Sequence, residues 1–258
     1  MTVQRWDRAL VAAPTTEARL PEVVALPPGL PGIDELFDFM RDAELRFTTL
    51  RMRIEERLWA TRGEQVVVSE VMLRHPGQAR VATFEPGAGT AGNHELWISD
   101  GATVRTYVGR DKRGTERPIR NRPRGLVDKD FPGTSKVYEP LTPLPTETLP
   151  ELFVHPAGYC QNVLATGRCW VSGTDVVAGR EAITLVCEHP RSVEWVADRQ
   201  DYRIEIAVDR AEGLITRLVE SVDGEVTRLA KVVALDVDAP LPPDAFEFEF
   251  PPGTSILF

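Results

Sequence analysis

Beyond Arg46 the spacing of apolar residues along this chain changes to a period of two. Within the segment Phe47–Leu58, apolar residues lie on one side and the charged residues Arg51, Arg53, Glu55 and Arg57 lie on the other. The apolar side consists of Leu50, Met52, Ile54 and Leu58. A period of two predicts a β-strand with one buried face.

Similar stretches continue to the end of the chain and predict about ten strands. Further strands are expected at 64–74, 80–84, 95–99, 103–108, 163 onward, 182–187, 193–196, 202–208, 214–222 and 226–237. The pair Asp100-Gly101 is of the type that closes tight hairpins. Connections of a few residues, without alternating long helices, favour an antiparallel sheet.

The remaining segments suggest a single β domain over residues 33–258. Residues 1–32 hold five prolines and predict an extended or partly ordered leader. A helix is expected from Ile33, where apolar residues fall on one helical face. Residues 110–160 are rich in proline and in basic residues, and predict a long insertion with one short helix at 146–153.

Charge and hydropathy limit the partners and the compartment. Thirty basic and 39 acidic residues give a net charge of −9, which offers no general attraction to nucleic acid. No apolar run approaches the about 20 residues of a membrane span, and none at the N-terminus resembles a secretory signal. The chain therefore reads as cytoplasmic, although a chain with its export signal removed would read the same.

Five local motifs follow one another along residues 33–253. They are the opening helix that runs into the strand Phe47–Leu58, the hairpin Leu96-Trp-Ile-Ser-Asp100-Gly101-x-x-Val104-x-x-Tyr107, the strand entry Val177-Ala-Gly179-Arg180-Glu-Ala-Ile183-x-Leu185, the turn Val208-Asp209-x-x-x-Gly213-Leu214-Ile-x-Arg217 and the ending Leu241-Pro-Pro-Asp-Ala-Phe246-x-Phe248-x-Phe250-Pro-Pro252-Gly253. Together they resemble the LolA-like superfamily of lipoprotein carriers, mycobacterial lipid-binding lipoproteins and RseB-type regulators.

This resemblance implies an α+β, mainly β fold. The expected architecture is an open half-barrel of about eleven antiparallel strands, strongly curved, with helices that cover the concave side and enclose an apolar cavity for acyl chains. Proteins of this superfamily are exported, so the resemblance suggests an extracytoplasmic location if a signal was removed.

The inward-facing apolar residues are the candidate ligand-binding residues. They are Leu50, Met52, Ile54, Leu58, Val68, Met72, Leu96, Ile98, Ile204, Ile206 and Leu218. Methionine and aliphatic side chains suit acyl chains because they adapt in shape and present no unpaired polar groups. A filled core would produce the same alternation, so both interpretations stay open.

A basic cluster at residues 110–124 is the candidate site for an anionic head group or an acidic partner. It holds seven basic and two acidic residues within an acidic protein. The residues proposed to carry it are Arg113, Arg117, Arg120 and Arg122. It contains no aromatic residue, which argues against single-stranded nucleic acid, and a solvated loop is the alternative.

The three cysteines do not predict a metal site. Cys160 and Cys169 are nine residues apart and Cys187 has only His189 nearby, which fits no compact zinc site. Buried thiols, or a Cys160–Cys169 bridge across a hairpin, are expected instead. Such a bridge would need an oxidising compartment.

Signals for catalysis are absent from the sequence. No Gly-x-Ser-x-Gly, His-Glu-x-x-His or phosphate-binding glycine loop occurs, and three of the four histidines precede a proline. Asp100, Asp209 and Asp223 lie beside or near glycines, where side-chain bonding within turns explains them. We therefore expect a non-catalytic carrier or sensor of an apolar ligand without a cofactor. The alternative is a protein-interaction or regulatory module with the same fold and a filled core.

Overall fold

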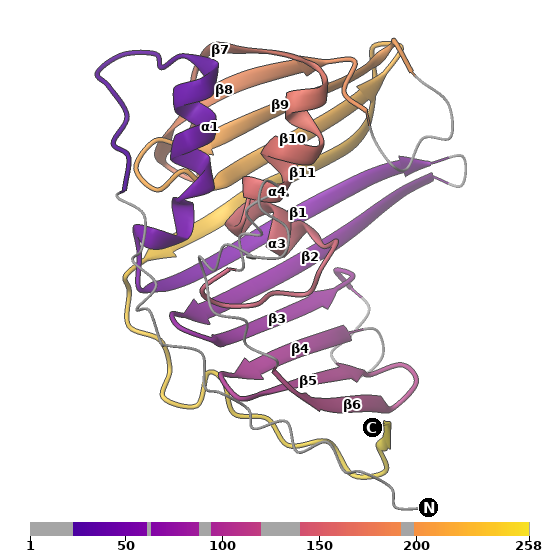
Figure 1. Ribbon diagram of the computed structural model, residues 1–258. Coiled ribbons are helices and arrows are strands. Elements are labelled where there is room, and N and C mark those ends of the chain that lie inside the picture. The colour runs from indigo at the N-terminus through magenta and orange to yellow at the C-terminus, as the bar shows by residue number, and fades with distance from the viewer. Residues whose placement is uncertain (1–22, 61–62, 88–93, 120–139, 192–198, 258) are drawn as a thin grey trace, which may run out of the picture.

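The computed structural model describes residues 23–60, 63–87, 94–119, 140–191 and 199–257, and these ranges form one twelve-stranded sheet (Figure 1). The strands are β1 (Thr49–Ala60), β2 (Gly63–Arg74), β3 (Gln78–Phe84), β4 (His94–Asp100), β5 (Thr103–Val108), β6 (Arg113–Pro118), β7 (Arg168–Val177), β8 (Arg180–Glu188), β9 (Tyr202–Asp209), β10 (Ile215–Val222), β11 (Glu225–Val237) and β12 (Ser255–Leu257). Their order in the sheet is β12-β6-β5-β4-β3-β2-β1-β11-β10-β9-β8-β7. The sheet is open, as expected.

Two runs of hairpins meet in the middle of the sheet. β1 to β6 form one antiparallel run and β7 to β11 form the other, and antiparallel pairing of β1 with β11 joins them. At the edge, β12 pairs with β6 in the parallel direction. The expectation of a purely antiparallel sheet was therefore wrong at this strand, because the chain reaches β12 from β11 in the middle of the sheet and no hairpin connects β12 to β6.

The helices lie on one face of the curved sheet, which we call the concave face (Figure 1). They are α1 (Ile33–Arg41), η1 (Ala43–Leu45), α3 (Leu149–Val154), α4 (Ala157–Asn162) and η2 (Leu164–Thr166). The helix expected from Ile33 is confirmed, and the carboxylate of Glu35 accepts the backbone N–H of Gly32 at 2.8 Å to cap it. Helices over a mainly β sheet confirm the predicted fold class.

Residues 110–160 contain more regular structure than the sequence pattern indicated. β6 begins at Arg113 without any alternation of apolar residues, because pairing with β5 determines it. The hydroxyls of Thr106 and Thr115 lie 2.6 Å apart across this pair. The expected strand from Val163 begins at Arg168 instead, after α4 and η2. The strand expected at 193–196 lies outside the described residues.

Two of the aspartates assigned to turns have that role in the structure. Asp100 Oδ1 accepts the backbone N–H groups of Ala102 and Thr103 at 2.9 and 2.8 Å. Asp209 Oδ1 accepts two backbone N–H groups of the turn that follows β9, while Arg180 pairs with both carboxylate oxygens. Both carboxylates therefore stabilise turns by accepting backbone N–H groups.

The C-terminal segment packs on the opposite side of the sheet, which we call the convex face. Phe248 and Phe250 pack against Leu96, Ile98 and Tyr107 and form a cluster separate from the larger one on the concave face, the main core. Gly114 of β6 fits against the ring of Phe250, where a Cβ atom would lie only 2.3 Å from Cε1. The ending Phe-x-Phe-x-Phe thus holds the C-terminal segment against the convex face.

We predict that Gly114→Ala lowers the free energy of unfolding by about 1–3 kcal/mol, because the added methyl group must push Phe250 out of a packed cluster. Gly158→Ala is the matched control, since no atom beyond its chain neighbours and the backbone of its own helix lies within 4 Å of a Cβ there. Urea unfolding of both variants is the measurement. Equal stabilities would contradict the packing described for the C-terminal segment.

Candidate functional site on the concave face

Cross-strand pairing decides which predicted ligand-binding residues share a face. Met52 of β1 lies opposite Val71 of β2, and both are buried in the main core. Directly opposed residues point to the same side of a sheet and successive residues to opposite sides. Val68 and Met72 lie opposite charged residues of β1, so they point to the convex face.

The same division occurs on β4. Val81 of β3 lies opposite Trp97, and both belong to the main core. Leu96 and Ile98 therefore point to the convex face, where they pack against the C-terminal segment. The predicted set does not form one surface, because the structure separates Val68, Met72, Leu96 and Ile98 from its other members.

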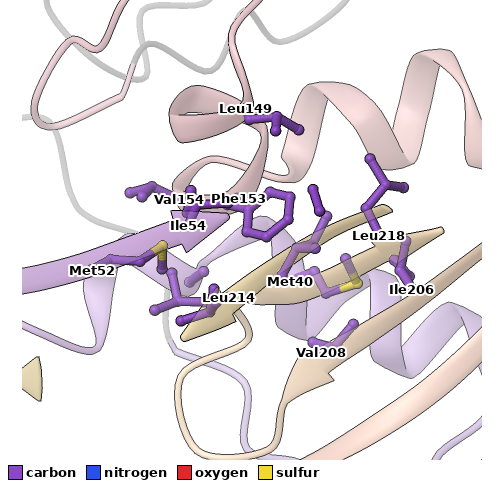
Figure 2. Close-up of a cluster of buried hydrophobic side chains, with 14 of the residues drawn as sticks. Met40, Met52, Ile54, Leu149, Phe153, Val154, Ile206, Val208, Leu214 and Leu218 are labelled. Atoms are coloured by element: carbon purple, nitrogen blue, oxygen red, sulfur yellow. The ribbon is translucent and has the colours of Figure 1, made fainter. Parts of the chain in front are cut away.

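The other predicted residues do come together on the concave face. Those in the main core, each at most 1% exposed, are Leu50, Met52, Ile54, Ile204, Ile206 and Leu218. Leu58 lies further along β1, half-buried and opposite Arg228 of β11. Figure 2 shows Met52, Ile54, Ile206 and Leu218 within one cluster of apolar side chains.

A helical cover, defined here as residues 140–166, lies over this cluster. α3 contributes Leu149, Phe153 and Val154, which are buried, and Phe153 is 0% exposed. Met40 of α1 joins them in the same cluster (Figure 2). Protein side chains thus bury the concave face beneath the cover, and a ligand bound there would have to displace part of it.

Polar contacts hold the N-terminal end of the cover. Thr142 Oγ1 accepts the backbone N–H of Gly77 at 2.9 Å and lies 2.7 Å from Nδ1 of His75. His155 Nε2 lies 2.9 Å from the carbonyl oxygen of Thr142. The carboxylate of buried Glu44 accepts the backbone N–H of Leu141 at 2.7 Å. We call this group the polar tether.

Burial lowers the pKa of His75 to about 4, and the nearby Asp238 carboxylate offsets only part of that effect. The His75 ring is therefore neutral at pH 7. A neutral ring matches the hydrogen bonding, because Thr142 accepts from Gly77 and can donate its own proton to Nδ1.

Sulfur contacts hold the C-terminal end of the cover. Cys160 of α4 is buried, and its Sγ lies 3.8 Å from Sδ of Met40. Cys169 and Cys187 lie directly opposite each other in β7 and β8, and their Sγ atoms are 3.0 and 3.4 Å from the carbonyl oxygen of Leu164. All three are free thiols, so the Cys160–Cys169 bridge is not present.

A charged group marks the end of the apolar surface on the concave face. Arg228 Nε lies 2.7 Å from Glu56 and its Nη1 3.3 Å from Glu220. The nearby hydroxyl of Tyr159 is buried without a hydrogen-bond partner in the described ranges, and burial followed by the Glu220 charge raises its pKa. The sequence pattern did not predict this group, although a glutamate at position 56 interrupts the inward series Leu50, Met52, Ile54 and Leu58.

The basic cluster is only partly within the described residues. Arg113 and Arg117 are exposed on β6 and share its concave side with Thr115. Arg120 and Arg122 lie outside the described residues. The structure thus places two of the four proposed anion-binding residues near the sheet edge, and the role of the cluster stays a prediction.

Within the described ranges, no group of three or more histidine, cysteine, aspartate or glutamate residues could hold a metal ion. None of their helices combines the length and apolarity needed to cross a bilayer. His75 and His155 both belong to the polar tether.

Comparison with known proteins gives similarity at the level of solved structures. No protein-family model matches the chain, and no curated protein matches it. The chain is similar to MucB, with 14% identity, a TM-score of 0.49 and coverage of 84% of this chain and 62% of MucB. It thus spans about three fifths of the MucB chain.

Two further structures illustrate the range of the similarity. An uncharacterised conserved protein from Thermus thermophilus matches with 13% identity and a TM-score of 0.49, over 87% of this chain and 97% of the other. A LolA superfamily protein from Nitrosomonas europaea matches with 9% identity and a TM-score of 0.33, over 84% and 98%. The structures found therefore include a protein of the superfamily that the sequence motifs resemble.

We predict that the stability of this protein falls as the pH is lowered from 6.5 to 4, because the unfolded chain binds a proton at His75 that the folded state resists. This contribution is at most about 3 kcal/mol. His75→Asn removes the titrating group and keeps a partner for Thr142. The measurement is the difference in unfolding free energy between the two proteins at pH 7 and at pH 4. Between pH 7 and pH 4 the native protein should lose more unfolding free energy than His75→Asn. A difference between the two proteins that does not change with pH would contradict the buried neutral ring.

Proposed function

We propose that this chain is a non-catalytic module that binds an apolar ligand on the concave face, in the place now occupied by part of the helical cover. The observation that carries the proposal is the construction of that cover. α3 and α4 are each six residues long, and polar or sulfur contacts hold the two ends of the cover. Between those ends, α3 meets the sheet through apolar side chains.

Such a cover is suited to replacement by a hydrocarbon chain. Helices of this length have little stability alone, so packing on the sheet keeps them in place. An acyl chain would replace the contacts of Phe153 and Leu149 with others of the same kind, and would leave no buried polar group unpaired. Met40 and Met52 can adjust their shapes to a new neighbour.

Arg113 and Arg117 support the finer proposal of an anionic head group or acidic partner. Both side chains are exposed on the concave side of β6, so an anion could approach them from solvent. Arginine binds phosphate and carboxylate groups through paired N–H donors. The ligand itself is proposed only as a molecule with a hydrocarbon portion.

The close packing beneath the cover favours a second candidate function. Six of the predicted ligand-binding residues lie in the main core, and each is at most 1% exposed, as it would be in a permanently filled core. A module of this kind would act by binding a protein partner on its surface. If Arg113 and Arg117 took part, the affinity for that partner would fall as salt is added.

We predict that a fatty acid bound to this protein contacts Met40 and Met52 and does not contact Met72. The chain has four methionines, of which Met40 and Met52 are in the main core and Met72 points to the convex face. The measurement is NMR of protein labelled with 13C in the methionine methyl groups, with oleate as the ligand. Magnetisation transfer should connect the ligand chain to the first two methyl groups.

Met72 serves as the internal control in the same spectrum. Transfer to Met72 alone would place the ligand on the convex face and would contradict the proposed site. No transfer to any methionine under saturating oleate would favour the protein-interaction module with a filled core.

We also predict that Phe153→Leu tightens the binding of a fluorescent fatty acid about fivefold. The smaller side chain should weaken packing of the closed cover by about 1 kcal/mol, and a ligand that competes with the cover gains that difference. Phe39→Leu is the matched control, because Phe39 is also buried but belongs to α1. Equal affinities for the two variants would contradict displacement of α3.

A further inference from the structure

Cys169 and Cys187 form a pair of thiols where the C-terminal end of the helical cover meets β7 and β8. They are directly opposed residues of β7 and β8, and both sulfur atoms approach the same carbonyl oxygen, that of Leu164. The distances from that oxygen are 3.0 Å for the sulfur of Cys169 and 3.4 Å for the sulfur of Cys187. The two sulfur atoms therefore lie side by side on the same face of the sheet.

The strand positions allow a covalent bond between them. Directly opposed residues in antiparallel strands have Cβ atoms about 4.5–5.5 Å apart, and a disulfide needs about 3.5–4.5 Å. The required shift is small. Among the described strands β7 pairs only with β8, and the register of that pair already shifts between Val171 and Gly173. An edge strand with this freedom can move toward its neighbour.

The two thiols differ in a way that gives each a separate role. Cys169 is partly exposed whereas Cys187 is buried. The hydrogen bond from Cys187 lowers the pKa of Cys169, and the same bond, followed by burial, raises the pKa of Cys187. Cys169 is therefore the thiol that a dissolved reagent can reach and that ionises first.

We propose that Cys169 and Cys187 are a redox-active pair that forms an intramolecular disulfide by exchange with a small-molecule disulfide such as oxidised glutathione. The proposal does not require that the protein bind an apolar ligand.

The exchange has two balanced steps. The thiolate of Cys169 attacks one sulfur of oxidised glutathione, which forms a mixed disulfide and releases one glutathione thiolate that takes up a proton. Cys187 then loses its proton and attacks the Cys169 sulfur, which releases the second glutathione. The protein loses two hydrogens and two electrons, and the glutathione disulfide gains them.

Cys160 is excluded from the pair by its place in the fold. It is buried in α4, and its sulfur contacts Met40. Burial raises the pKa of its thiol, with the neighbouring Cys169 adding to the effect. Cys160→Ser is therefore the matched control, since it removes a thiol without removing either member of the pair.

The test is incubation of the folded full-length protein with an excess of oxidised glutathione, followed by trypsin digestion without reduction and mass spectrometry. Cleavage after Arg168, Arg180 and Arg191 separates residues 169–180 from 181–191, so the bond joins two distinct peptides. The intact protein should lose about 2 Da, and titratable thiols should fall from three to one. Cys160→Ser should give the same joined peptides.

Two variants complete the design. Cys187→Ser should stop at the mixed disulfide with glutathione on Cys169, and Cys169→Ser should react far more slowly because its remaining thiols are buried. Three free thiols in the native protein after equilibration would overturn the proposal. So would a bond that joins Cys160 to Cys169, or a pair that forms only after the protein is unfolded.

Discussion

The antiparallel pairing of β1 with β11 holds the two halves of the sheet in register. It joins two antiparallel runs that are far apart in sequence, and it sets Met52 opposite Leu235 in the centre of the sheet. Once this register is fixed, alternation assigns every side chain of both runs to the concave or the convex face. A slip by one residue would turn Leu50, Met52 and Ile54 out of the main core.

Local patterns predicted most of the fold. The spacing around Ile33 predicted α1, and the alternation from Phe47 predicted β1 as a strand with one buried face. Asp100-Gly101 predicted a hairpin because its side-chain and backbone requirements are local. β6 and β12 were missed because their strand structure comes from neighbours distant in sequence. At Gly114, for example, the ring of Phe250 occupies the space that a side chain would need.

The candidate site was predicted less completely, because alternation shows that a residue is buried without showing on which face. Leu96 and Ile98 have the pattern of inward residues, yet the C-terminal segment buries them on the convex side. The polar tether joins residues 44, 75, 142 and 155, which no linear motif connects. The compartment in which the protein works stays a prediction, and it bears on Cys169 and Cys187 because an oxidising environment would favour their bond.

We propose that an apolar ligand and the helical cover compete for the same surface. Hydrogen–deuterium exchange of the folded protein, with and without saturating oleate, is the measurement that tests this competition. We expect faster exchange in α3 and α4 with ligand, while the backbone amides that pair β1 with β11 stay protected. Bound oleate that leaves exchange in α3 and α4 unchanged would contradict it.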